Sequence, residues 1–249
     1  MPFSISRWLA AFKDGLINLL YPNTCWVCGR FTPDSPARLC PSCEHLLTTD
    51  PQPTCPRCSS SVGPHVPLAD GCVHCREKTL AYDGALRLGP YEGLLREVII
   101  RLKNSREETL AEIIGGIWAR HLTPRLRELS PYAVVPVPLH WTRRYWERGF
   151  NQSEILARCL GHTLQIPCYP YCIRRLRRTP RQTYQISEAA RRDNVRGAFQ
   201  ARAQYSLAGK VVLLVDDVLT TGATANEAAR ALRVLKPSRI IVVVLAHGN

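Results

Sequence analysis

Residues 211–224, VVLLVDDVLTTGAT, combine side chains that could hold a phosphorylated sugar. An apolar run ends in two adjacent acids, Asp216 and Asp217, and a turn rich in threonine and glycine leads into a helical pattern. In open α/β sheets, ligands bind beyond the carboxyl ends of the strands, and the first turn of a helix offers free amide donors. We expect the carboxylates to accept hydrogen bonds from two adjacent ribose hydroxyls. The expected phosphate contacts come from Thr220, Thr221, Gly222 and Thr224.

Two other phosphate chemistries fit this segment less well. A P-loop requires GxxxxGK[ST], and the turn has no such lysine. A phospho-acceptor aspartate needs further acids from an earlier strand, and AVVPVPLH at 133–140 contains none. A purely structural turn would not require two acids, three threonines and a glycine together.

Eight of the eleven cysteines form four CxxC pairs, a spacing that lets two thiolates converge on one tetrahedral ion. The intervening gaps, 29–39 and 59–71, fit two short zinc ribbons. Redox dithiols or disulfides are the alternative, and a reducing cytoplasm argues against disulfides. The pairs are Cys25/Cys28, Cys40/Cys43, Cys55/Cys58 and Cys72/Cys75.

The spacing allows two pairings of these ligands, a sequential one and a cross-braced one in which the first pair joins the third and the second joins the fourth. In the sequential case the first two pairs hold one Zn²⁺ and the last two pairs hold another, and both sites are closed and structural. Two full four-cysteine sets leave the nearby histidines without a necessary role. The remaining thiols, which we expect to be ordinary buried or half-buried side chains, are Cys159, Cys168 and Cys172.

The positive charge of the chain is concentrated in its middle. The net charge is +13, but residues 21–80 hold five basic and five acidic side chains and are neutral. Residues 141–202 hold thirteen arginines and four acids. Guanidinium groups suit bidentate contacts with phosphate, so a polyanionic small molecule or a nucleic-acid backbone would satisfy this region equally.

Apolar periodicity predicts a mostly parallel α/β sheet flanked by helices. Short apolar runs that read as strands alternate with helical patterns, as in sheets that are buried on both faces. The expected strands are 133–137, 211–217 and 239–246, and the expected helices are 92–103, 107–122, 153–161 and 224–235.

We divide the chain into three parts: an amphipathic helix over 1–22, a double zinc ribbon over 23–80 and the α/β domain over 81–249. Lys13 and Asp14 interrupt the first apolar stretch, which argues against a cleaved signal. No apolar run is long enough to span a bilayer. We therefore expect a cytoplasmic protein without stable membrane insertion, whose first helix packs on the protein or on a partner.

Residues 211–224 closely resemble the phosphoribosyl-pyrophosphate (PRPP) signature of type I phosphoribosyltransferases. The four CxxC pairs and the segments YEGLLREVIIRLKNSREETLAEII, VVPVPLHWTRRYWERGFNQSEILA and RQTYQISEAARRDNVRGAF resemble the ComF, or competence protein F, family. The resemblance implies that Asp216 and Asp217 contact the ribose of PRPP, with Mg²⁺ bridging its hydroxyls and pyrophosphate. It also implies that Ala223 joins Thr220, Thr221, Gly222 and Thr224 in holding the 5′-phosphate.

The resemblance further implies a pyrophosphate contact from the loop after AVVPVPL, where Arg143, Arg144 and Arg148 are available. Lys103 is a weaker candidate for contact with the same anion. The arginines between 174 and 181 could form a pyrophosphate lid or a nucleic-acid track. The aromatic side chains near the loop could stack bases or could simply pack the loop onto the core. The arginines are Arg174, Arg175, Arg177, Arg178 and Arg181. The aromatic residues are Trp141, Tyr145, Trp146 and Phe150.

The family is associated with single-stranded DNA handling during natural transformation, which implies single-stranded DNA and a DNA-uptake or helicase protein as partners. No separate acceptor pocket is visible after the strand at 239–246. We therefore expect a retained sugar-phosphate site with lost or specialised chemistry. The alternative is an active PRPP-dependent transferase whose unknown acceptor contacts come from the zinc ribbons or from 81–122.

Overall fold

The computed structural model describes residues 23–32, 38–104, 107–139, 149–177 and 188–248. The helix expected over 1–22 lies outside these residues. The chain divides into two compact units, Met1–Leu46 and Leu47–Asn249. The division falls between the two cysteine sets, so the second set belongs to the same unit as the sheet.

The first unit contains a tight knuckle around Cys25. The amide of Cys25 donates to the carbonyl of Arg30 at 2.7 Å, and Thr24 forms an antiparallel bridge with Phe31. Helix α2 (Pro41–Thr48) begins directly after Cys40. The first cysteine pair therefore lies in a tight turn, and the second pair lies at the start of a helix.

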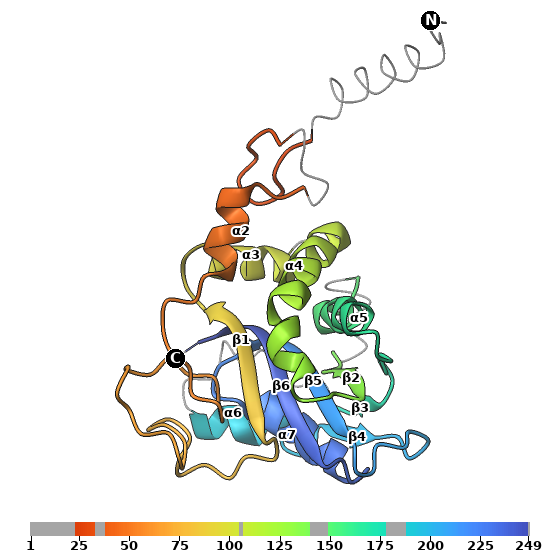
Figure 1. The fold of residues 1–249 in the computed structure, drawn as a ribbon. Coiled ribbons are helices and arrows are strands. Elements are labelled where there is room, and N and C mark those ends of the chain that lie inside the picture. Colours follow the sequence, from red (N-terminus) through yellow and green to blue (C-terminus); the bar gives the residue numbers. More distant parts are fainter. Residues whose placement is uncertain (1–22, 33–37, 105–106, 140–148, 178–187, 249) are drawn as a thin grey trace, which may run out of the picture. The chain divides into compact units, whose positions relative to one another are not determined.

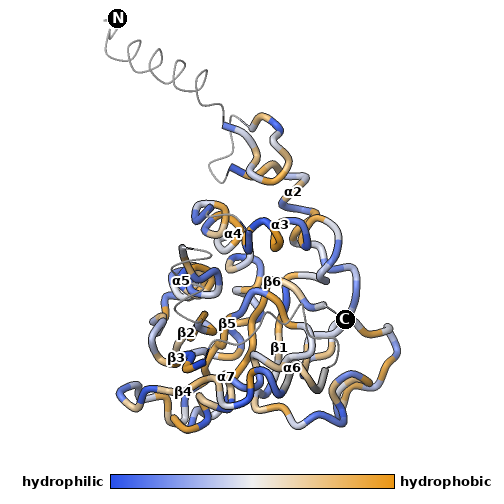
Figure 2. The backbone as a smooth tube through the Cα atoms, turned by 180° about the vertical axis from the view of Figure 1, so that it is seen from behind, coloured by the Kyte–Doolittle hydropathy of each residue, from blue (hydrophilic) through white to orange (hydrophobic). Residues whose placement is uncertain are grey.

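A four-stranded parallel sheet is the centre of the second unit (Figure 1). Its strand order is β1 (Gly84–Pro90), β6 (Arg239–His247), β5 (Val211–Leu219) and β2 (Ala133–Pro136). The central strands are hydrophobic along most of their length, as Figure 2 shows. This confirms the predicted parallel sheet, although β1 was not predicted.

Helices cover both faces of this sheet (Figure 1). Helices α3 (Gly93–Asn104), α4 (Glu108–Arg127) and α5 (Gln152–Leu164) lie on one face, and α7 (Ala223–Arg233) lies on the other. The indole of Trp118, fully buried in α4, donates to the carbonyl of Val244 at 2.9 Å and fixes this helix on β6. Helix α4 continues past the predicted end at residue 122 to Arg127, and Pro124 lies within it.

Shorter elements complete the second unit. Strands β3 (Ile173–Arg175) and β4 (Phe199–Ala201) pair antiparallel, and helix α6 (Glu188–Val195) precedes β4. None of the helices in the described ranges is long and apolar enough to cross a membrane.

Candidate functional site

The predicted sugar-phosphate segment forms the end of β5, a short turn and the start of α7. Four buried residues, Val212 to Val215, hold the strand in the sheet, and Asp216 and Asp217 follow at its carboxyl end. The turn then runs from Thr220 to Gly222. The structure therefore presents two carboxylates and the start of a helix at the edge where parallel sheets bind ligands.

Gly222 gives the turn its shape. Its φ of 77° lies in the left-handed region, where a side chain would be strained. A Cβ at this position would lie 3.1 Å from the hydroxyl oxygen of Tyr82. The carbonyl of Gly222 accepts the amide of Asn226 at 2.8 Å, which starts α7. The left-handed conformation thus favours glycine, and a side chain at this position would also require the Tyr82 hydroxyl to shift.

Asp216 is held by two donors on one carboxylate oxygen. The hydroxyl of Ser153, in the first turn of α5, donates to Oδ1 at 3.0 Å, and the amide of Asp217 donates to the same atom at 2.9 Å. Burial, and then the negative charge of Asp217, raise the pKa of Asp216 to about 7. The acid pair can therefore hold one proton near neutral pH.

Lys103 lies beside the second acid. Its Nζ, at the end of α3, is 3.3 Å from Oδ2 of Asp217 and 5.9 Å from the ring centre of Tyr91. The structure thus brings a residue expected only as a weak anion contact directly to the carboxylates. Ser153, Tyr91 and Tyr82 were not predicted as site residues, because no short-range sequence signal links β1, α5 and the turn.

Several residues that we predicted to contact the ligand lie outside the described residues. The arginines among them are Arg143, Arg144, Arg148, Arg178 and Arg181. The aromatic residues are Trp141, Tyr145 and Trp146. Phe150 is half-buried.

The described arginines of the same basic region contact the protein itself. The guanidinium of Arg174 donates twice to the side-chain oxygen of Gln200, at 3.0 and 2.6 Å, and Arg177 donates to the carbonyl of Arg196. The guanidinium of Arg175 lies 5.3 Å from the ring centre of Phe199. These three side chains therefore have structural contacts around the β3–β4 hairpin, whatever further role they have.

The cysteines gather into two sets of four, Cys25/Cys28/Cys40/Cys43 and Cys55/Cys58/Cys72/Cys75. Within each set the sulfur atoms lie within 4.8 Å of one another. Four sulfurs at about 2.3 Å from a central Zn²⁺ are about 3.8 Å apart. The distance is 3.7 Å between Cys28 and Cys40, and 3.8 Å between Cys55 and Cys75. Both sets therefore fit structural zinc, in the sequential pairing rather than the cross-braced one.

The other three thiols stand apart from these sets. Cys172 is buried, and Cys159 and Cys168 are half-buried. Burial raises the pKa of Cys168 to about 11, as expected for an unreactive thiol. As predicted, all three are buried or half-buried thiols.

The second cysteine set is tied to the sheet by its backbone. The carbonyl of Pro56 accepts the amide of Ala85 in β1 at 3.1 Å. Ser60 Oγ lies 3.3 Å from Nε2 of His247 at the end of β6. The guanidinium of Arg57 donates to the carbonyls of Cys75 and Lys78, at 3.0 and 2.7 Å. The bonds of Pro56 and Ser60 thus attach the loop around this set to β1 and to the carboxyl end of β6, and those of Arg57 hold the loop together.

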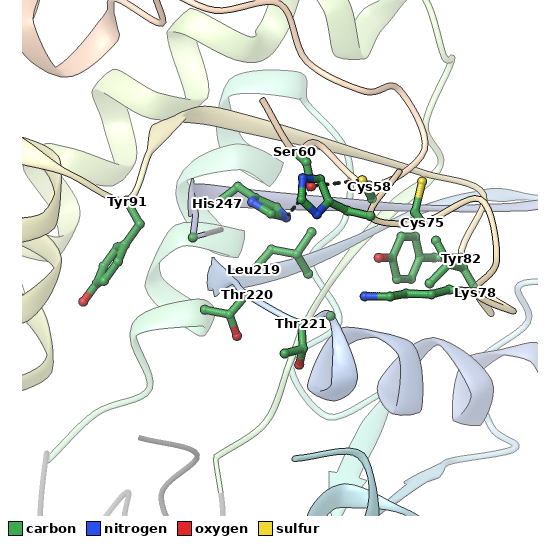
Figure 3. Close-up of a pocket in the computed structure, with 14 residues that line it drawn as sticks. Cys58, Ser60, Cys75, Lys78, Tyr82, Tyr91, Leu219, Thr220, Thr221 and His247 are labelled. Carbon is green, nitrogen blue, oxygen red and sulfur yellow. Dashed lines mark hydrogen bonds between the residues drawn. The ribbon is translucent and has the colours of Figure 1, made fainter. Parts of the chain in front are cut away.

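A cavity of about 330 Å³ lies between this loop and the Thr220–Gly222 turn (Figure 3). Leu219 and the turn itself form one wall, and residues around the second cysteine set form the other. This cavity was not predicted from the sequence, since its walls come from segments more than 130 residues apart. Its polar and aromatic lining residues are Ser60, His74, Lys78, Tyr82, Tyr91, Thr220, Thr221 and His247.

Comparisons with known proteins agree with this arrangement. Residues 169–249 match the phosphoribosyl transferase domain family, and residues 16–77 match the double zinc ribbon domain family. DNA utilization protein YhgH of Escherichia coli O157:H7 is 31% identical over 218 residues, covering 86% of this chain and 92% of that protein. Competence protein F of Haemophilus influenzae is 32% identical over 216 residues, covering 84% and 90% respectively.

A solved adenine phosphoribosyltransferase resembles the chain more distantly. The identity is 18% and the TM-score 0.35, over 55% of this chain and 70% of that one. The family matches and the parallel sheet together confirm the predicted fold class, a phosphoribosyltransferase-type α/β domain preceded by zinc ribbons.

Proposed function

The chain belongs to the ComF family, with competence protein F and DNA utilization protein YhgH among its relatives, and from this premise we propose that it binds PRPP or another 5′-phosphorylated ribose and acts in the handling of single-stranded DNA during DNA uptake. The observation that carries the ligand is the end of β5, where an acid pair precedes a glycine-dependent turn at a helix start. The DNA role is proposed from the names of the relatives.

In the proposed complex, the amides at the start of α7 bind the 5′-phosphate together with the hydroxyls of Thr220, Thr221 and Thr224. Helix starts favour such anions, and Gly222 and Ala223 leave room for the phosphate to approach the backbone. Asp216 and Asp217 accept the hydrogen bonds of the ribose hydroxyls. Ser153 and Lys103 support this proposal, because they fix the two carboxylates from separate helices.

The pyrophosphate of PRPP carries most of the ligand's charge, and we assign its contacts to Lys103 and to Arg143, Arg144 and Arg148. Mg²⁺ is the ion that suits carboxylate and phosphate oxygens, and it would neutralise the pyrophosphate when bound. Asp216 and Asp217 are the carboxylates available near it. The positive charge between 141 and 202 supports a polyanionic ligand in this part of the chain.

A binding role, with lost or specialised catalysis, is distinguished from an active PRPP-dependent transferase by turnover. In the transferase, the bond from C1 of the ribose to pyrophosphate breaks, pyrophosphate leaves with the electron pair, and C1 bonds to an acceptor. Such a step requires positioning and charge stabilisation more than a protein nucleophile. The acid pair would be essential in both cases.

The test is phosphorus NMR of the zinc-loaded full chain with PRPP, Mg²⁺, a panel of bases and a single-stranded oligonucleotide. We expect the PRPP resonances to broaden without release of pyrophosphate, and the double variant Asp216→Asn, Asp217→Asn to abolish the broadening. Asp70→Asn with Glu128→Gln removes two exposed carboxylates away from the site and serves as the matched control. Rapid pyrophosphate release with an ordinary base would establish the transferase instead.

The DNA role is tested by the salt dependence of oligonucleotide binding. Contacts between arginine and phosphate release counterions, so affinity should fall steeply between about 50 and about 200 mM salt. An affinity that hardly changes over this interval would exclude the basic region as a nucleic-acid track.

A further inference from the structure

We propose that Gln152 and Ser153, in the first turn of α5, are positioning residues: Gln152 sets the place of Lys103, and Ser153 sets the place of Asp216. The inference rests on the proposed function, because it takes a phosphorylated ribose to be the ligand of the acid pair. It adds two residues that act on the ligand through other side chains, one for the pyrophosphate and one for the ribose.

Three consecutive polar side chains in this turn are buried. The exposed fractions of Asn151, Gln152 and Ser153 are 5%, 1% and 4%. Side chains of these types are mostly exposed in proteins, and their burial is unfavourable unless new hydrogen bonds replace those to water. The bonds that these side chains form therefore indicate what the turn is used for.

Asn151 does not cap the helix that it begins. It is the N-cap residue of α5, a position where an asparagine oxygen commonly accepts an amide of the first turn, but its side chain forms no such bond. Its Nδ2 instead donates to the carbonyl of Val137, just after β2, at 3.1 Å. No donor in the described part of the chain reaches its buried Oδ1. The turn thus gives up a bond that would stabilise α5 and makes one to the end of a strand.

Gln152 joins α5 to the end of α3. Its Nε2 donates to the carbonyl of Leu102 at 2.8 Å. This carbonyl belongs to the last turn of α3, where carbonyls have no partner within the helix. The next residue is Lys103, whose Nζ lies 3.3 Å from Oδ2 of Asp217. The bond from Gln152 therefore fixes the backbone from which the lysine side chain extends.

Ser153 holds the first acid from the same turn. Its hydroxyl donates to Oδ1 of Asp216 at 3.0 Å, and the amide of Asp217 donates to the same atom at 2.9 Å. Both bonds are on one oxygen, so they fix the orientation of the carboxylate and direct its other oxygen, Oδ2, to a different side. Oδ2 is the oxygen that we assign to the ribose.

One short turn thus holds three chain segments that end at the ligand site. Helix α5 contacts β2 and β5 along its length (Figure 1), and its first turn adds the bond to α3. Because Gln152 and Ser153 are neighbours in a helix, the lysine and the acid pair keep a fixed separation before the ligand arrives. Groups that are already in place lose less freedom on binding, so both halves of PRPP are bound more tightly.

The test measures, by calorimetry on the zinc-loaded full chain with Mg²⁺, the affinities of PRPP and of ribose 5-phosphate. Gln152→Met keeps the length of the side chain and removes its donor. It should weaken PRPP about tenfold, as expected for one lost hydrogen bond, and ribose 5-phosphate much less, because that ligand has no pyrophosphate. Ser153→Ala should weaken both ligands by a similar factor, and Ser153→Thr, which keeps the hydroxyl, should restore them.

A double variant shows whether Gln152 acts through Lys103. In a protein that already carries Lys103→Met, Gln152→Met should weaken PRPP no further, because the group that it positions is gone. Thr163→Val is the matched control: it removes a hydroxyl that donates to the carbonyl of Cys159 at 2.9 Å in the last turn of the same helix. It should leave the affinities of both ligands unchanged.

A residue that only stabilises the fold would give a different pattern. Equal losses of both ligands in Gln152→Met, or additive losses in the double variant, overturn the inference alone. Ser153→Ala removes a single oxygen atom and carries the test by itself if Gln152→Met does not fold, since an unchanged affinity for ribose 5-phosphate in it overturns the inference. Failure of the unaltered protein to bind either ligand overturns the proposed function, and the inference with it.

Discussion

The protonation of Asp216 makes the stability of the folded protein depend on pH near neutrality. Its pKa is raised to about 7 by burial and by Asp217, whereas an unfolded aspartate titrates near 3.8. Between these values the folded protein binds a proton that the unfolded chain has lost, so the contribution of this group to stability falls as pH rises toward 7.

Asp216→Asn should therefore stabilise the ligand-free protein, and more so at pH 7 than at pH 4.5. The amide oxygen can still accept the hydrogen bonds from Ser153 and from the amide of Asp217. A gain on the order of 1–3 kcal/mol at pH 7, shrinking at pH 4.5, is expected from the linkage relation. Urea unfolding of both proteins at the two pH values measures it. A gain of the same size at both would show that Asp216 titrates as an ordinary carboxyl.

Lys103 allows the pyrophosphate contact to be separated from the ribose contact. If its ammonium group moves from Asp217 to the pyrophosphate of PRPP, Lys103→Met should weaken PRPP binding about tenfold, as expected for a lost charged hydrogen bond. Ribose 5-phosphate, which lacks the pyrophosphate, should lose much less. Lys236→Met, an exposed change outside the site, is the matched control. A parallel loss for both ligands would show that Lys103 only positions Asp217.

At the scale of elements, the turn between β5 and α7 depends on one backbone conformation. Gly222→Ala should cost about 1–2 kcal/mol of unfolding free energy because the residue needs a positive φ. Gly116→Ala, within α4, where a methyl group meets only the flexible end of Arg120, should instead stabilise the protein by about 0.5–1 kcal/mol.

The double variant Gly222→Ala, Tyr82→Phe distinguishes backbone strain at position 222 from a steric clash with the Tyr82 hydroxyl. Tyr82→Phe removes the hydroxyl that a Cβ at position 222 would approach to 3.1 Å. Partial recovery of stability in thermal unfolding would assign part of the cost to that contact. No recovery would assign all of it to the backbone.

The sequence predicted the site best where a single segment contains both a secondary-structure element and the side chains that could bind a ligand. The apolar run of β5, the acid pair and the turn are contiguous, so this half of the site could be predicted with its residues. Strand β1, GALRLGP, was missed because it contains two glycines, a proline and an arginine, which are unusual in a buried strand. Arg87 is buried there only because Asp50 and Ser61, from the segment before β1, accept its hydrogen bonds at 2.9 and 2.8 Å.

The cavity could not be predicted for a related reason. Its walls meet only after the loop around the second cysteine set packs on the end of β6, through pairs such as Ser60 and His247 that are 187 residues apart. Spacing rules identify the zinc ligands in each knuckle, but they do not say which surface of the fold the knuckle contacts. The cavity beside the Thr220–Gly222 turn is therefore a property of tertiary packing.

At the scale of the whole molecule, the two cysteine sets should differ in what they stabilise, because the chain divides between them. The second set is bonded to β1 and β6 within the unit that contains the Thr220–Gly222 turn. Cys72→Ser with Cys75→Ser should therefore release one zinc ion, lower the melting temperature of the sheet unit and weaken ribose 5-phosphate binding. In so small a segment, metal binding supplies folding free energy.

The matched change in the first unit, Cys40→Ser with Cys43→Ser, should also release one zinc ion but leave the melting of the sheet unit and its ligand affinity unchanged. Hydrogen exchange of β5 and β6 provides a readout that does not depend on ligand, since loss of the second set should raise exchange at their carboxyl ends and loss of the first should not. If both double variants disturb the sheet equally, the two cysteine sets form one cooperative structure with it. If neither does, the bonds from the second loop to β1 and β6 contribute little to the fold, and the wall of the cavity must be held by the packing of Tyr82 and Leu219.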